Sequence, residues 1–175
     1  MSKIKLANVR LSFPSLFKMA SFGGEPTGKF EATFILDKDE HAEAIAQLKK
    51  HIDTLMKTEL KGKIAADKIC LKDGDDLGRP EFDGKYTIKA STKKRPLVID
   101  RDKSPLTEED GKPYAGAYVN AIISLWAQNN TWGKRINAQL DGVQFCRDGE
   151  PFGDGGVSAD EFDAFGGDDE DDFNF

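Results

Sequence analysis

The chain has 175 residues, of which 38% are hydrophobic and 32% are charged, with 31 acidic and 25 basic side chains. This length suits one domain with its own core, and no apolar run approaches the roughly 20 residues that a membrane-spanning helix needs. The N-terminus lacks an apolar stretch suited to a signal peptide, and the two cysteines, Cys70 and Cys146, fit a compartment with reduced thiols. We therefore expect an intracellular protein.

Two strands are predicted in the first 37 residues. Apolar side chains alternate along residues 3–13, but their parity changes at residues 7–8. Such a change predicts a β-bulge, which helps a small sheet to curl towards a barrel. Residues 15–28 are typical of a loop with glycines at its tip, and residues 28–37 alternate again as a second strand.

The period then changes to that of an amphipathic helix over residues 39–60, which should pack on the sheet. Asp37 and Glu40 are spaced as in a capping box at its start. His41 and His51 lie ten residues apart on this helix, so they share no metal-binding face, and we expect both to be solvated. Its apolar positions are Ile45, Leu48, Ile52, Leu55 and Leu60.

The sequence after residue 60 predicts a short second helix at residues 62–71 and four further strands. These strands are expected at residues 85–92, 97–100, 118–127 and 135–145. The segments between them, 73–84, 101–116 and 128–133, are polar or rich in turn residues. Six strands with one long helix between the second and third predict a mainly β (α+β) fold. We expect an OB-fold-like Greek-key barrel, with a half-open sandwich as the alternative.

The last 22 residues differ from the rest in charge. Residues 154–175 hold nine acidic side chains and no basic one, so residues 1–153 keep 22 acidic and 25 basic side chains. This predicts a nucleic-acid-binding domain over residues 1–153 and a disordered acidic tail over residues 154–175. Four phenylalanines are spaced through the carboxylates, and the sequence ends on Phe175. Such a tail can occupy a basic groove or dock on a partner, and a plain solubility tail is the alternative.

Cations and aromatic rings are interleaved in the second half of the body. Lysines on one face of residues 85–93 continue into Lys94 and Arg95, while Trp126 lies on a polar strand face and Trp132 in a turn. Binding of single strands without sequence preference requires aromatic rings that stack on bases and cations that contact phosphates. The candidate DNA-binding residues are Phe22, Phe82, Lys85, Lys89, Lys93, Lys94, Arg95, Tyr114, Tyr118, Trp126, Trp132 and Arg135.

No pattern in the sequence predicts catalysis. There is no CxxC pair and no phosphate-binding glycine loop. Residues 73–84 loosely resemble a calcium loop, but Leu77 and Gly84 stand where that motif needs oxygen ligands. We therefore expect no catalytic residue, metal or cofactor, and a nuclease is the least supported function because the body holds no carboxylate cluster with metal spacing.

Three body segments and the acidic terminus resemble the phage-encoded single-stranded DNA-binding proteins. They read KIKLANVRLSFPSLF, KFEATFILDK, GAYVNAIISLWAQ and DDEDDFNF, and the resemblance covers essentially the whole chain. It implies that the tail competes with DNA and contacts replication proteins such as a polymerase or helicase–primase. The tail residues that carry this implication are Asp168, Asp169, Glu170, Asp171, Asp172, Phe173 and Phe175.

The resulting prediction is a phage protein that binds single-stranded DNA during replication and recombination, in the cytoplasm of the infected bacterial host. It is expected to have no membrane partner, and binding to duplex DNA stays open. Two alternatives also stay open: a recombination mediator that anneals strands, and a DNA-mimic inhibitor that acts through its acidic tail. Annealing assays would separate the first, and failure of the isolated body to bind any oligonucleotide would favour the second.

Overall fold

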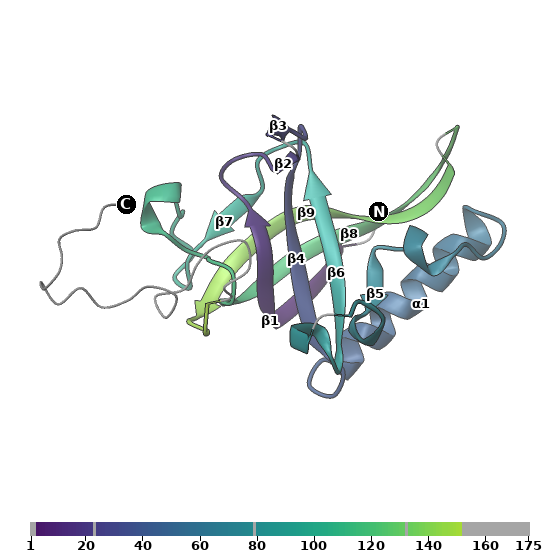
Figure 1. The fold of residues 1–175 in the computed structure, drawn as a ribbon, viewed down its shortest axis with the longest axis horizontal. Coiled ribbons are helices and arrows are strands. Elements are labelled where there is room, and N and C mark those ends of the chain that lie inside the picture. Colours follow the sequence, from purple (N-terminus) through teal and green to yellow (C-terminus); the bar gives the residue numbers. More distant parts are fainter. Residues whose placement is uncertain (1–2, 23, 79, 132, 152–175) are drawn as a thin grey trace, which may run out of the picture.

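The computed structural model describes residues 3–22, 24–78, 80–131 and 133–151, and within them seven strands form one sheet (Figure 1). Trp132 and the predicted tail lie outside the described residues. The long strands are β1 (Lys3–Ser15), β4 (Phe30–Asp37), β6 (Lys85–Thr92), β8 (Tyr118–Asn130) and β9 (Gly133–Arg147). The short strands are β2 (Ser21–Phe22), β3 (Glu25–Pro26), β5 (Leu71–Asp73) and β7 (Leu97–Ile99).

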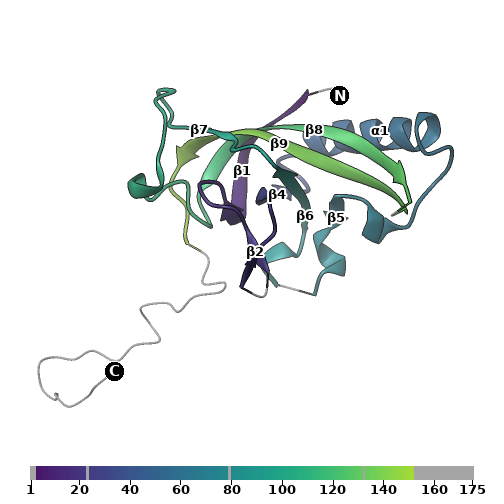
Figure 2. The ribbon, with the colours of Figure 1, turned by 90° about the horizontal axis from the view of Figure 1, so that it is seen from above.

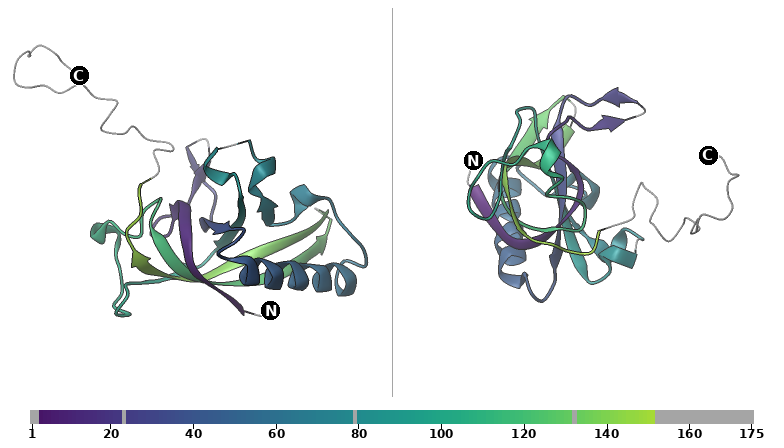
Figure 3. Two further views of the ribbon diagram at one scale, coloured as in Figure 1. Left: turned by 90° about the horizontal axis from the view of Figure 1, so that it is seen from below. Right: turned by 90° about the vertical axis from the view of Figure 1, so that its left-hand side faces the viewer.

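The sheet closes into a barrel. Its order is β5-β6-β4-β1-β8-β9-β7, and a parallel pairing of β6 with β9 joins Ala90 to Ala138 and Ser91 to Gln139. Viewed end-on, the strands surround a central core (Figure 3). The helix α1 (Ala42–Thr58) lies between β4 and β6 in the chain. The predicted mainly β, OB-like barrel with one long helix is confirmed.

The parity change in the first strand is a bulge, as predicted. Ile4 and Leu6 point into the core before it, Val9 and Leu11 after it, and all four are at most 1% exposed. The pairing with β8 shifts in register between Leu6 and Val9, and Asn8 adopts a φ of 53° there. Asparagine tolerates this left-handed conformation better than most residues, which makes it a suitable bulge residue.

The β8–β9 hairpin is longer than predicted. Its pairing continues to Asn130 and Gly133, so the expected turn at 128–133 is mostly strand. The hairpin extends past the barrel as an arm beside α1 (Figure 2). The side chain of Asn129 donates to the Glu59 carbonyl at 3.4 Å, and the Lys134 ammonium donates to the Leu60 carbonyl at 2.9 Å. A cation near the C-terminal end of a helix is favourable, so the hydrogen bond from Lys134 helps to hold the arm against the end of α1.

Two expectations about the helical region are wrong. The Asp37 carboxylate accepts the Asp39 and Glu40 N–H groups at 2.9 and 3.0 Å, but α1 starts only at Ala42 and the capping box does not form. The predicted helix at 62–71 is a single 3₁₀ turn, Ala66–Lys68, followed by β5. In the described residues, three further 3₁₀ turns lie in loops, at Gly74–Asp76, Pro80–Phe82 and Glu108–Asp110. No helix in the described part of the chain is both long and apolar enough to cross a membrane.

His41 is not a solvated helix residue, contrary to the expectation. Its side chain is 11% exposed; Nδ1 accepts the Asp37 N–H at 2.9 Å, and Nε2 lies 3.0 Å from the Asn8 carbonyl oxygen. With Nδ1 as acceptor, the proton of the neutral ring sits on Nε2 and is donated to Asn8. The ring therefore joins the end of β4, the start of α1 and the β1 bulge.

Replacing His41 with alanine should lower the free energy of unfolding by about 1–3 kcal/mol, because the Asp37 N–H and the Asn8 carbonyl both lose a partner. Denaturant titration of the full chain measures this change. The matched control is His51→Ala, since the His51 side chain makes no hydrogen bond to the described residues of the chain. Equal unfolding midpoints for the two variants would show that His41 has no structural role.

Candidate nucleic-acid interface

Alternate residues of β6, β9 and β8 form one outward-facing polar surface. Ser91 lies opposite Gln139 across the β6–β9 pairing, and Asn137 lies opposite Trp126 across the β8–β9 pairing. The intervening residues, such as Ala90, point into the core, where Ala90 is fully buried. Two adjoining hollows open on this surface, and both are lined by Ser91.

The larger hollow, here called the Trp126 groove, has a volume of about 540 Å³ and is lined by three lysines and a tryptophan. Trp126 is 38% exposed, which is high for so large an apolar side chain. Lys29, Lys93 and Lys94 are exposed and form no ion pair within the described residues. The groove therefore offers a ring face next to three lysines that have no carboxylate partner among the described residues. Its lining residues include Lys29, Thr92, Lys93, Lys94, Trp126 and Gln139.

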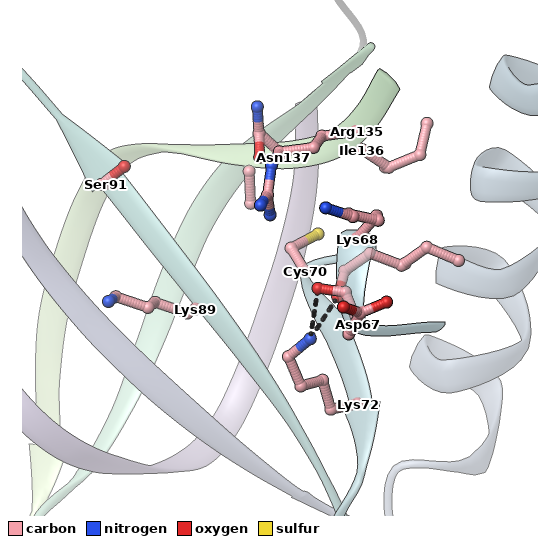
Figure 4. A pocket seen from close by; sticks show the side chains of 11 residues that line it. Asp67, Lys68, Cys70, Lys72, Lys89, Ser91, Arg135, Ile136 and Asn137 are labelled. Carbon is pink, nitrogen blue, oxygen red and sulfur yellow. Dashed lines mark hydrogen bonds between the residues drawn. The ribbon is translucent and has the colours of Figure 1, made fainter. Parts of the chain in front are cut away.

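The smaller hollow, here called the Cys70 pocket, has a volume of about 210 Å³ (Figure 4). Lys89 and Arg135, two of the predicted DNA-binding residues, line it. Burial raises the pKa of the Cys70 thiol to about 12, so this thiol is protonated at neutral pH and is a weak nucleophile. Within the described residues no group of acidic, histidine or cysteine side chains could hold a metal ion.

The predicted lysine row on β6 is divided by ion pairs. Lys85 contacts the Asp37 carboxylate at 2.9 Å, and Lys89 contacts Glu31 at 2.8 Å. The hydrogen bond from the Glu40 N–H, followed by that from Lys85, holds the pKa of Asp37 well below its usual range. Lys85 lies at the start of β6 and lines a separate hollow, so it does not belong to the Trp126 groove.

One acidic residue, Asp141, lies next to the groove residue Gln139. Its carboxylate accepts hydrogen bonds from Ser124 at 2.6 Å and from Gln139 at 2.8 Å, and lies 3.5 Å from the Lys3 ammonium. Partial burial opposes ionisation, but these hydrogen bonds and the charge of Lys3 bring the pKa of Asp141 below its ordinary value. The carboxylate is therefore ionised, its charge is partly offset by Lys3, and it holds the Gln139 amide.

Several predicted aromatic residues lie elsewhere. Phe82 is only 4% exposed and belongs to the buried set, so the expectation that it offers a ring to DNA is wrong. Two arginines, Arg10 and Arg147, contact the Tyr118 ring, with guanidinium carbons 5.8 and 3.8 Å from its centre. The Tyr114 hydroxyl donates to Asp148 at 2.8 Å.

Neither tyrosine lines the groove or the pocket, and Tyr118 shares the separate hollow of Lys85. Arg95 lies over the Phe17 ring at 5.6 Å. The Phe22 side chain and Trp132 lie outside the described residues. The structure therefore brings together five of the predicted residues, namely Lys89, Lys93, Lys94, Trp126 and Arg135.

Three basic residues of this surface were missed by sequence reasoning: Lys29, Lys68 and Lys72. Lys29 precedes β4, whose first residue Phe30 pairs with Thr92 of β6, and this pairing places Lys29 near Lys93. The β4–β6 register could have indicated Lys29. No sequence signal indicated the other two, because they lie in a short irregular segment.

Comparison with known proteins identifies the family of this chain. The family model described as "Enterobacter phage Enc34, ssDNA-binding protein" matches residues 2–174. A putative protein p50 of Acyrthosiphon pisum secondary endosymbiont phage 1 is 42% identical over 173 residues, covering 92% of each chain.

Solved structures agree with this match. The single-stranded DNA-binding protein from bacteriophage Enc34, solved in complex with ssDNA, has a TM-score of 0.78 and 35% identity, over 86% of this chain and 89% of that one. The single-stranded DNA-binding protein gp2.5 of bacteriophage T7 has a TM-score of 0.52 at 13% identity, over 90% and 98% of the chains, and supports the fold alone. By its sequence match and its structure, the chain belongs to the Enterobacter phage Enc34 ssDNA-binding protein family.

Proposed function

We propose that this protein binds single-stranded DNA with little sequence preference, and that the Trp126 groove holds the strand. The observation that carries the proposal is an exposed tryptophan beside Lys29, Lys93 and Lys94, which lack ion pairs within the described residues. Every base offers a ring face for Trp126 and every nucleotide offers a phosphate for a lysine, so such a surface tolerates any sequence. Membership of a family described as ssDNA-binding supports the same function.

The proposed role is in phage DNA replication and recombination inside the infected bacterial host. A protein that coats exposed strands would protect them and remove hairpins. The acidic residues 154–175 would compete with DNA for the basic surface and, once released, recruit replication proteins such as a polymerase or helicase–primase. Binding of this kind needs only positioned cations and rings, so the proposal invokes neither a cofactor nor a catalytic residue.

Affinity for single-stranded DNA should fall steeply with salt. If the surface neutralises three to five phosphates, the slope of log affinity against log salt should be roughly −2 to −3.5. Fluorescence titration of the full chain with dT, dA and mixed-sequence oligonucleotides at several salt concentrations measures both the slope and the sequence tolerance. A flat salt response, or tight binding to one sequence only, would overturn the proposed function.

Replacing Trp126 with alanine should weaken binding to poly-dT by about 1–3 kcal/mol, which is the contribution of one stacked base. Wild-type fluorescence should be quenched on binding, and the variant should lose part of this signal. Because Trp126 is 38% exposed, the variant should fold. Its unfolding midpoint provides the control, and unchanged affinity in a folded variant would remove Trp126 from the interface.

A further inference from the structure

The Cys70 pocket lies where β6 and β9 diverge. The two strands pair directly only around Ser91 and Gln139. Before this point in both strands, the Cys70 N–H donates to the Ile136 carbonyl of β9 at 3.0 Å, and the Lys89 N–H of β6 donates to the Cys70 carbonyl at 3.4 Å. The segment around Cys70 therefore spans the gap between the strands, and the Cys70 side chain lines the pocket (Figure 4).

Part of the lining of this pocket is apolar. Ile69, Cys70, Ile136 and Ala138 contribute to it, and Ile136 and Ala138 belong to the core with 0% and 4% exposure. A phosphate placed against this part would lose its hydration, which is costly. The flat, weakly polar ring of a nucleobase loses much less. The apolar part of the lining therefore favours a ring over a charged group.

The charge around the pocket is mainly positive. Four basic side chains line it, Lys68, Lys72, Lys89 and Arg135, together with the acidic Asp67, and Lys89 is paired with Glu31 at 2.8 Å. The Lys72 ammonium donates to the carbonyls of Asp67 and Ile69 at 3.2 and 3.1 Å, so it is fixed at the edge. Arg135 forms no ion pair within the described residues, and it lines the pocket together with Asn137 and Cys70 (Figure 4). A guanidinium plane can stack on a base, and the neighbouring ammonium groups can meet its flanking phosphates.

We propose that the Cys70 pocket receives one nucleobase of the bound strand, next to the base that stacks on Trp126. The pocket adjoins the Trp126 groove through Ser91, and Asn137 of the pocket pairs across the sheet with Trp126. Its volume of about 210 Å³ equals the share of about seven liquid waters, which suits one ring system rather than a whole nucleotide. This inference rests on the proposed function, and it adds a subsite that holds a base by its ring.

The test fills the pocket. Cys70→Met adds bulk to its lining, and Cys146→Met is the matched control, because Cys146 is the other free cysteine and lines neither the groove nor the pocket. Each full-length variant is titrated with a dT oligonucleotide and with an abasic deoxyribose-phosphate chain of equal length. Cys70→Met should lower affinity for dT about tenfold and leave affinity for the abasic chain unchanged. Cys146→Met should match wild type on both chains.

Each other outcome overturns a different statement. Equal affinity of Cys70→Met and wild type for dT would show that no base enters the pocket. An equal loss on dT and on the abasic chain would make it a phosphate site. Failure of the wild-type protein to bind the dT oligonucleotide would instead overturn the proposed function.

A second measurement avoids the substitution in the pocket. In Cys146→Ser protein, the slow alkylation of Cys70 by iodoacetamide should be slowed several-fold by dT and unaffected by the abasic chain. Equal alkylation rates with and without dT, at DNA concentrations that saturate binding, would overturn the pocket proposal even if Cys70→Met fails to fold.

Discussion

Deleting residues 154–175 should raise the affinity for single-stranded DNA about tenfold at low salt. The deletion removes nine carboxylates and no cation, and it leaves residues 1–153 with three more basic than acidic side chains. The tail and DNA are both anionic chains, so they should compete for the same basic groove. The gain should shrink as salt rises, because the Debye length falls to about 8 Å near physiological salt.

The experiment compares full-length, tail-deleted and Phe175→Ala proteins at two salt concentrations, with capture of a replication partner alongside. Phe175→Ala keeps all nine carboxylates, so it should retain the competition with DNA while weakening the capture, where an aromatic anchor matters most. Neutralising Asp168–Asp172 should impair both. Equal DNA affinity of full-length and tail-deleted proteins at low salt would exclude competition, and normal capture by the tail-deleted protein would exclude docking through the tail.

Replacing Lys29, Lys93 and Lys94 together with alanine should make the salt slope shallower by about 2, since each phosphate contact on a single strand contributes about 0.7. Near 0.1 M salt this corresponds to a loss of affinity of roughly 100-fold. The expected loss is large because these three lysines, unlike Lys85 and Lys89, have no carboxylate partner within the described residues. Among the described residues, no carboxylate therefore competes with phosphates for their positive charge.

The matched control removes three exposed lysines from the helix and the segment after it that have no ion pair within the described residues: Lys50, Lys61 and Lys63. This variant has the same net charge as the groove variant, so it separates a local effect from a general one. It should bind DNA with nearly the wild-type salt slope. If both triple variants lose the same affinity, the overall charge attracts DNA and the Trp126 groove has no special role.

Local patterns in the sequence were sufficient to predict much of the fold. Each of these patterns shows which side of an element faces the core. They are the alternation in the strands, its interruption at Asn8, and the helical spacing of Ile45, Leu48 and Ile52. These patterns predicted the long strands, the bulge, the helix and the OB-like class. They also predicted Trp126 as an exposed ring on a polar strand face, because its neighbours Leu125 and Ile123 carry the core parity.

The tertiary structure alone decided which predicted residues share a surface. The pairing of β4 with β6 brings Glu31 to Lys89 and places Lys29 near Lys93, and neither relation follows from strand periodicity. Phe82 is buried although its loop is polar. The Cys70 pocket exists because β6 and β9 pair briefly and then diverge. Pairings between distant segments depend on how the sheet closes, whereas periodicity reports only which side of an element faces the core.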